Sequence, residues 1–254
     1  MFKLILSIII ISQGILFAHC DGCGTHEHSK NGVLSGNVNY LGKLPKAESN
    51  IRMDSEPTCG AVHDHDIYPG AFIADENMNL KNVLVWIKNI EYDASVPEKP
   101  AILDQKGCVY FPHVFGIMKN QKLLVKNSDV IAHNIHSFPE VNTSFNSGQP
   151  GGIDLVKSFS ESEEPFYIKC DVHPWMKSWV LVQNHPYFSV TDENGNFKIE
   201  DIPPGSYEVV FWQEKLSTLN SNKFIVQPNV IEVTITANEI TEQNFTFKQP
   251  KRVE

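Results

Sequence analysis

The sequence predicts an all-β protein made of two β-sandwiches. Short runs in which apolar and polar residues alternate, as in half-buried strands, occur along the chain, for example at 33–40, 166–170 and 207–211. Turn signals separate such runs, among them Asn194-Gly195 and Pro203-Pro204-Gly205. A chain of 254 residues is long enough for about two domains with cores of their own.

The charge balance limits the partners of the chain. It has 21 Lys and Arg against 30 Asp and Glu, which gives a formal net charge of −9 with neutral His. Nucleic acid and anionic membrane surfaces attract basic patches, so we expect no nucleic-acid partner. A basic protein is a more compatible partner for an acidic chain.

Residues 1–19 are predicted to be a secretory signal peptide. Lys3 precedes a strongly apolar run that reaches Phe17, and the small residue Ala18 follows it. Because this pattern fits a cleaved signal better than a spanning helix, we expect no transmembrane segment in the mature chain and export to the periplasm or the extracellular space. Cleavage is expected after Ala18 or near Cys20. The alternative is a membrane-anchored lipoprotein with its lipid on Cys20, although the histidine before that residue is unfavourable.

The elements before residue 100 indicate the start of one sandwich. After a flexible tail at 20–32, the run 33–40 predicts a strand, and a turn with Gly and Pro at 42–45 ends it. Residues 54–79 are rich in Pro, Gly, Asp and His and predict a long loop. The β-branched and aromatic run 82–87 predicts a buried strand.

The next elements belong to a second sandwich, in which no segment shows helical periodicity. The run 122–126 predicts a strand, whereas the Gly-rich stretch 146–152 predicts a loop. The acidic run 161–164 is expected to be a solvated turn. Beyond this second sandwich, two strands at 231–235 and 244–247 close the chain.

One short segment of the second sandwich offers metal ligands. In Cys170-Asp-Val-His173-Pro-Trp-Met176 a thiolate, an imidazole and a thioether follow one another, and His133 offers a second imidazole upstream. The preceding run alternates at period two, which directs Cys170 to the core. Two imidazoles, a thiolate and a weak thioether suit copper in both oxidation states.

Three other interpretations of this segment stay open from the residues alone. Cys and Met are common core residues, so packing accounts for any one of them. A Cys with two His also binds zinc and leaves a fourth position open. A Cys–His nucleophile pair is disfavoured, because a core-facing Cys lacks the exposure that a nucleophile needs.

The pattern Cys-x2-His-x2-Met with Pro174 after the His, a strand before it and His133-Asn134 upstream resembles the cupredoxins, with the loop spacing of the amicyanin group. The likeness extends over about residues 100–185. It implies a Greek-key β-sandwich that binds one type 1 (blue) copper ion. The residues that it implies are the equatorial ligands His133, Cys170 and His173, the axial ligand Met176, and Asn134, whose hydrogen bond would tether the ligand loops.

The same resemblance implies a one-electron carrier and not an enzyme, because the donor set lacks the extra open copper that nitrite or oxygen reduction requires. Electrons would leave through the edge of His173, near the surface, where Pro174 and Trp175 would form an apolar patch. The partner would be a basic redox protein such as a c-type cytochrome. The alternatives are a copper capture and delivery protein of the cell envelope, and a non-catalytic β-sandwich binding or adhesion protein with a vestigial metal site.

A second resemblance concerns the C-terminal part. Asp192-x2-Gly-x-Phe and Pro203-Pro-Gly-x-Tyr resemble the carboxypeptidase regulatory-like (transthyretin-like) β-sandwich, a pattern that says little about chemistry. Such a sandwich usually opens with a Gly-x-Val strand, which occurs here only within 35–40. The domains predicted on this basis are a regulatory-like sandwich formed by 33–99 and 186–248, and a cupredoxin-like domain at 100–185 inserted between these two parts.

The chain has five Cys, which in an exported protein are expected to pair where they can. Because Cys170 is reserved for the metal, Cys59 and Cys108 are natural partners, and we predict a disulfide that holds the 54–79 loop onto the first strand of the cupredoxin-like domain. Cys20 and Cys23, with His26 and His28 nearby, form a copper-capturing tail, a local disulfide or a mobile end. His63 and His65 in the long loop indicate either a second metal site or a solvated loop.

Overall fold

The computed structural model describes residues 30–252 except 47, 89, 94, 220–222 and 226–228. The predicted signal peptide and the tail with Cys20 and Cys23 lie outside the described residues. Within the described part, the two helices are single turns, α1 (Pro57–Gly60) and α2 (Glu214–Ser217), and strands make up the rest of the regular structure. Among these residues no helix combines the length and the apolar character that a membrane span needs. The predicted all-β fold class is confirmed.

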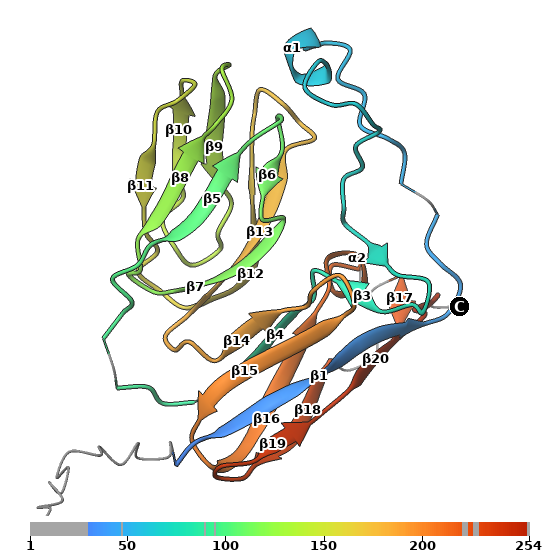
Figure 1. Cartoon of the computed structure of the whole chain (residues 1–254), viewed down its shortest axis with the longest axis vertical. Helices are drawn as coiled ribbons and strands as arrows, with labels where there is room; N and C mark the ends of the chain where they lie inside the picture. Colours follow the sequence, from blue (N-terminus) through green and yellow to red (C-terminus); the bar gives the residue numbers. More distant parts are fainter. Residues whose placement is uncertain are drawn as a thin grey trace, which may run out of the picture.

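The first sandwich consists of two sheets (lower half of Figure 1). Its strands are β1 (Gly32–Leu41), β4 (Leu84–Lys88), β14 (Phe188–Val190), β15 (Asn196–Ile202), β16 (Gly205–Trp212), β18 (Val230–Ile235), β19 (Ile240–Glu242) and β20 (Phe245–Lys248). One sheet has the order β15-β1-β19, with β20 also paired to β1, and the other has the order β14-β4-β16-β18. Inward-facing residues of both sheets, such as Leu34, Ile87 and Phe211, form a core between them because successive side chains alternate between the two faces of a strand.

The second sandwich lies above the first in Figure 1 and also has two sheets. Its strands are β5 (Ala101–Gln105), β6 (Tyr110–Phe111), β7 (Val114–Met118), β8 (Leu123–Asn127), β9 (His133–Ser137), β10 (Asn146–Gln149), β11 (Leu155–Lys157), β12 (Glu163–Lys169) and β13 (Lys177–Gln183). The sheet orders are β10-β9-β12-β13-β7 and β11-β8-β5-β6. A separate core fills the space between these sheets, and it includes Cys170 and Met176.

The chain enters the second sandwich after β4 and returns to the first at β14. β1 pairs in antiparallel fashion with β15, and it pairs in parallel fashion with β19 and β20. β4 lies between β14 and β16 in the other sheet. Strands from both ends of the chain therefore share hydrogen bonds in each sheet of the first sandwich.

The two sandwiches are joined by an apolar contact. The outward face of β7 and β13 packs against the sheet that contains β4 and β16, through a cluster with Trp86, Trp179 and Trp212. The ring centres of Trp179 and Trp212 lie 4.9 Å apart. Gly116 on β7 leaves room for the ring of Phe188, since a Cβ at this position would lie 2.4 Å from that ring. Aromatic side chains bury large areas, so this contact holds the sandwiches together.

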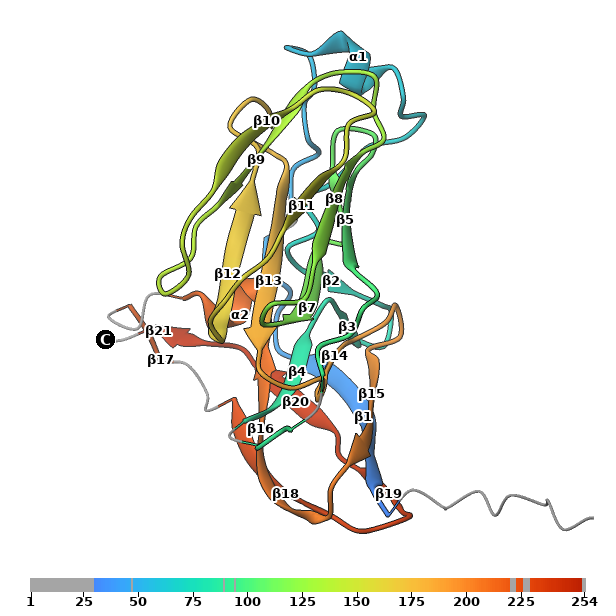
Figure 2. The same cartoon turned by 90° about the vertical axis from the view of Figure 1, so that its left-hand side faces the viewer.

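A long crossing segment, residues 42–79, connects β1 to the rest of the first sandwich by way of the second (Figures 1 and 2). It carries α1 to the far end of the second sandwich and returns to the short hairpin of β2 (Ile73–Ala74) and β3 (Leu80–Lys81). Met53 and Cys59 of this segment belong to the core of the second sandwich. The predicted Cys59–Cys108 disulfide is present and fixes α1 there.

Two local predictions were wrong. Asn146 to Gln149, expected within a loop, form β10, because the backbone groups at the outer edge of β9 need hydrogen-bond partners. Glu163, expected in a solvated turn, is only 8% exposed and begins β12 beside a register shift. The remaining short pair joins β17 (Phe224–Ile225) to β21 (Lys251–Arg252).

Candidate metal centre

The strand β12 and the turn after it place Cys170 inside the second sandwich. Phe166, Ile168 and Cys170 are buried, whereas the residues between them are half-exposed, as the period of a strand requires. The backbone N–H of Cys170 donates to the carbonyl of Met176 at 3.1 Å. The N–H of Met176 donates in turn to the carbonyl of His173 at 2.9 Å, so the turn is closed on itself.

Three side chains from two elements converge in the core. The donor atoms of His133, which begins β9, and of Cys170 and His173 all lie within 4.8 Å of one another. The Nδ1 atoms of the two imidazoles are 2.9 Å apart, and Nδ1 of His173 lies 3.8 Å from Sγ of Cys170. All three residues are at most 3% exposed. We call these three side chains the donor group.

The surroundings of Cys170 favour its thiolate form. Burial alone would raise the pKa of the thiol, but the hydrogen bond with His133 and backbone N–H groups lower it below its usual range. Two of these N–H groups, from Asn134 and His173, each donate to Sγ at 3.4 Å. The thiolate is the form of Cys that binds metals.

The electrostatics also favour positive charge at the donor group. Burial would lower the pKa of His133, but its hydrogen bond to Asp129 and its contacts with Cys170 raise this pKa to about 9. Burial and the neighbouring His133 lower the pKa of His173. One imidazole of the donor group, that of His133, therefore takes up a proton more readily than the other.

The other predicted site residues surround the donor group. Met176 is fully buried and helps to close the turn through its backbone. The side chain of Asn134 accepts from the N–H of Asp171 and donates to Asp171 at 3.3 Å, and thus links β9 to the turn after Cys170. Pro174 is exposed, and Trp175 is half-buried. His173 itself is 3% exposed, so its imidazole lies below the surface and not at it.

The remaining His residues of the sequence analysis lie outside the donor group. His136 points away from His133 and lies 2.8 Å from a carboxylate oxygen of Asp171. His63 lies 2.6 Å from the carbonyl of Gly107, and His65 pairs with Asp64 at the surface. In the part of the chain that the structure describes, neither His63 nor His65 joins a cluster of three potential ligands.

The sequence analysis missed Asp129. One of its carboxylate oxygens lies 2.8 Å from Nε2 of His133, the nitrogen that faces away from the donor group. Its own pKa is lowered below the usual range, because hydrogen bonds from His133, Cys108 and Gly107 outweigh the effect of burial. The spacing of Asp129 four residues before His133 is the one signal in the sequence that could have indicated this pair.

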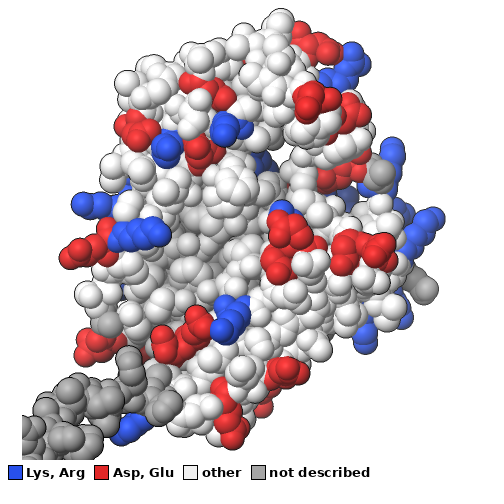
Figure 3. All heavy atoms as spheres, in the orientation of Figure 1, with Lys and Arg blue, Asp and Glu red and all other residues white. Residues whose placement is uncertain are grey.

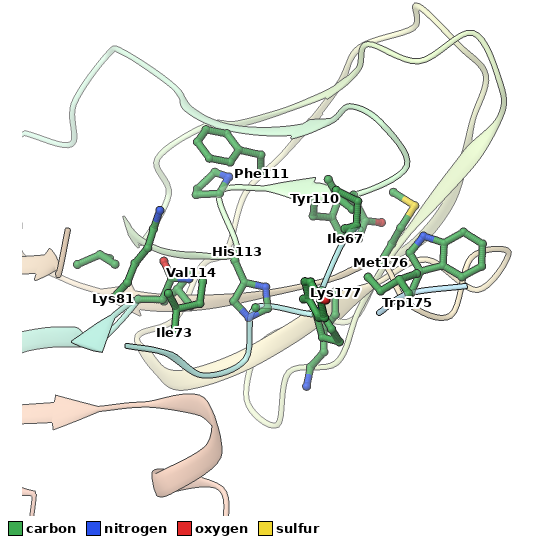
Figure 4. A pocket seen from close by; sticks show the side chains of 18 of the residues that line it. Ile67, Ile73, Lys81, Tyr110, Phe111, His113, Val114, Trp175, Met176 and Lys177 are labelled. Carbon is green, nitrogen blue, oxygen red and sulfur yellow. The ribbon is translucent and has the colours of Figure 1, made fainter. Parts of the chain in front are cut away.

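An open pocket of about 430 Å³ lies beside this region, between the sandwiches (Figure 4). Trp175 and Met176 lie at one end of it, and Lys81 of the first sandwich lies at the other. Ile51 and Ile67 of the crossing segment also line it. The turn after Cys170 is therefore bordered by an open pocket and by the crossing segment.

Comparisons with known proteins find similarity only among solved structures, since no protein-family model and no curated protein matches the chain. A copper-containing nitrite reductase (NirK) from Thermus scotoductus SA-01 is 20% identical over 37% of this chain, with a TM-score of 0.31, and the chain spans 24% of its length. A purple cupredoxin from Nitrosopumilus maritimus is 23% identical, with a TM-score of 0.29, and covers 33% of this chain and 99% of its own. A Cu(I) form of an amicyanin variant is 16% identical, with a TM-score of 0.31, over 39% of this chain and 98% of its own. These similarities concern a minor part of the chain, so the assignment of a metal and of a function depends on the donor group itself.

Proposed function

We propose that this protein is an exported one-electron carrier that binds one type 1 copper ion at His133, Cys170, His173 and Met176. The convergence of two imidazole Nδ1 atoms and a thiolate in a buried space carries this proposal. Nitrogen and sulfur ligands about 2.0 to 2.3 Å from one metal ion lie roughly 3 to 4 Å from each other. In the donor group the separation of 3.8 Å lies within this range and that of 2.9 Å lies just below it.

The chemistry of the donors favours copper over zinc. A soft thiolate and a buried thioether favour Cu(I), and imidazole nitrogens accommodate Cu(II), so that bound copper would gain and lose one electron. Met176 is the residue that distinguishes this set, because thioethers are poor zinc ligands. The protein itself would hold the ligands still, since β9 and the closed turn after Cys170 fix the donor positions from two sides.

Electron transfer without catalysis fits the burial of the site. The donor group is closed to solvent, which leaves no open position for a substrate. The other cluster of potential ligands among the described residues consists of Cys108, Asp129 and His133, but Cys108 is already in the disulfide. Among the described residues, no further preformed group of three such side chains is available for a second copper ion.

The proposed partner is a basic redox protein such as a c-type cytochrome, which the protein meets after export through its signal peptide at 1–19. The net charge of −9 would attract such a partner. On the face in Figure 3 acidic and basic side chains are interspersed, so the attraction there comes from the sum of charges and not from one acidic patch. A small and transient interface suits a carrier that must release its partner quickly.

Addition of Cu(II) to the purified protein tests this function. An intense visible absorption, followed by reversible reduction and reoxidation without loss of copper, is expected of an electron carrier. Copper that leaves readily for a chelating acceptor protein would favour copper delivery instead. A protein that stays colourless with copper would leave a non-catalytic binding or adhesion role with a vestigial site.

A further inference from the structure

The turn formed by Gly107 and Cys108 lies next to the donor group, although it supplies no ligand. Both residues have positive φ angles, 65° for Gly107 and 56° for Cys108. This conformation is uncommon for a residue with a side chain. Cys108 is held in the turn by its disulfide to Cys59, at the end of the crossing segment. Two successive backbone N–H groups of such a turn can bind one anion.

The anion bound by this turn is the carboxylate of Asp129. One oxygen accepts from the N–H of Gly107 at 2.7 Å, and the other accepts from the N–H of Cys108 at 2.8 Å. The second oxygen also lies 2.8 Å from Nε2 of His133. The side chain of Asp129 is 12% exposed and that of His133 is fully buried, so water hardly competes for these contacts.

The same turn contacts the second imidazole through another side chain. The indole N–H of Trp175 donates to the carbonyl of Cys108 at 2.9 Å. The ring of Trp175 packs against that of His173, with the ring centres 5.2 Å apart. One two-residue turn therefore supports both imidazoles of the donor group, through Asp129 on one side and Trp175 on the other.

We propose that Asp129 is a positioning residue for His133, and that the turn of Gly107 and Cys108, held by the disulfide, is the common support of both imidazoles. The inference deepens the proposed copper site and rests on it. A carboxylate on Nε2 keeps the proton on this nitrogen and directs the lone pair of Nδ1 toward Cys170 and His173. Its negative charge stabilises the more positive oxidation state of a bound copper ion.

The first test uses the metal-free protein and NMR of its imidazole protons. The Nε2 proton of His133 is expected to give a downfield, slowly exchanging signal, which Asp129→Asn shifts or removes. Glu214→Gln is the matched control, because Glu214 is a buried carboxylate 2.7 Å from Nε2 of His113, which is not in the donor group. This control should change the signal of His113 alone. A His133 signal that is the same in Asp129→Asn overturns the proposal.

The second test measures the affinities for Cu(II) and Cu(I), together with the reduction potential. Loss of a hydrogen bond to the nitrogen of a His ligand that does not bind the metal typically lowers metal affinity about 10- to 100-fold. For Asp129→Asn we expect such a loss of affinity for Cu(II), a smaller loss of affinity for Cu(I), and therefore a higher reduction potential of the bound copper. In Glu214→Gln the affinities and the reduction potential should not change. If Asp129→Asn binds Cu(II) and Cu(I) as tightly as the unsubstituted protein and only its melting temperature is lower, Asp129 has a structural role alone. If the unsubstituted protein takes up no copper, the proposed function fails, and the NMR signal still decides the role of Asp129.

The disulfide part of the inference has its own test. Replacement of both Cys59 and Cys108 by Ser, or reduction of the disulfide in the unsubstituted protein, should raise the reduction potential of the bound copper, as Asp129→Asn does. Because both changes act through one turn, their combination should have clearly less effect than the sum of the two. Fully additive effects would show that the disulfide does not act through Asp129.

Discussion

The Nδ1 atoms of His133 and His173 lie 2.9 Å apart, although the two residues are 40 positions apart in the sequence. Two unprotonated nitrogens repel each other at this distance, so a hydrogen bond between them requires a proton on one of the two. A metal ion bound by both nitrogens must displace that proton, because only the unprotonated imidazole is a ligand.

Copper binding should therefore release protons. The pKa of His133, raised to about 9, means that the metal-free protein holds this proton at neutral pH. The affinity for Cu(II) should rise as the pH increases from 6 toward about 9 and level off above it. Calorimetry in buffers with different ionisation enthalpies measures the released protons. An affinity that does not change over this pH range would contradict the arrangement of the donor group.

Replacement of the thiolate should abolish the colour of the copper protein and preserve the fold. In Cys170→Ser the apolar core remains, whereas the sulfur that gives the charge-transfer band is lost. Visible absorption after Cu(II) addition and far-UV circular dichroism check both parts of this prediction.

Two His variants provide its control. His133→Ala should bleach the protein, whereas His136→Ala, on the other face of β9, should keep the colour. If His136→Ala bleaches and His133→Ala does not, the two residues have exchanged roles.

Glu163 should contribute to stability through its charge. Its carboxylate accepts hydrogen bonds from the backbone of Glu140, Val141 and Asn142 and from the side chain of Asn142, and these bonds lower its pKa in spite of burial. Hydrogen bonds to a charged group are worth about 1.5 to 3 kcal/mol, so Glu163→Gln should lower the free energy of unfolding by an amount of this order. The same change at exposed Glu161 should have little effect in urea denaturation. Equal effects of both changes would show that the buried charge is unimportant.

The buried His185 should make the metal-free protein less stable in acid. It is 1% exposed, and burial lowers its pKa from the usual value of about 6.5 to about 4. Since the unfolded chain binds this proton more readily, the stabilisation is complete above about pH 6.5 and is lost as the pH falls toward 4. The shift corresponds to about 3 kcal/mol.

A variant without the titrating ring isolates this effect. His185→Asn keeps an acceptor for the N–H of Tyr187, which donates to Nδ1 of His185 at 3.2 Å. Urea denaturation between pH 7 and 4 should show a smaller loss of stability in this variant. Parallel pH profiles of the two proteins would refute the assignment to His185.

The elements that the sequence predicts well are those with a strong local pattern. Alternation before Cys170 predicts its inward orientation, because a strand has a period of two that neighbouring elements do not alter. The runs 33–40 and 231–235 became β1 and β18 for the same reason. The Cys59–Cys108 disulfide could be predicted because Cys170 is assigned to the metal and the other two Cys lie together in the N-terminal tail, and this disulfide is present.

What the sequence could not predict depends on contacts between distant residues. Asp129 is significant only because the left-handed turn at Gly107 and Cys108 meets it, and nothing near Asp129 indicates that turn. Glu163 belongs to an acidic run that is typical of solvent, but a register shift in β12 turns it toward the backbone of another loop. Buried charges of this kind follow from tertiary structure, whereas composition predicts exposure.

The last prediction concerns the route of electrons to a partner. His173 is buried, but Val172 beside it is 61% exposed and Pro174 is exposed, so a partner would meet these two residues before the imidazole. Val172→Lys should slow oxidation of the Cu(I) protein by a basic cytochrome, because it sets like charges against each other at the contact. The same change at Val156, which is 60% exposed on β11, is the matched control and should alter the rate little.

Stopped-flow rates of the unsubstituted protein should fall as salt is added, since charges are screened over about 8 Å at physiological ionic strength. Rates that respond to neither salt nor Val172→Lys would mean that electrons leave elsewhere, and equal slowing by both variants would reflect net charge alone.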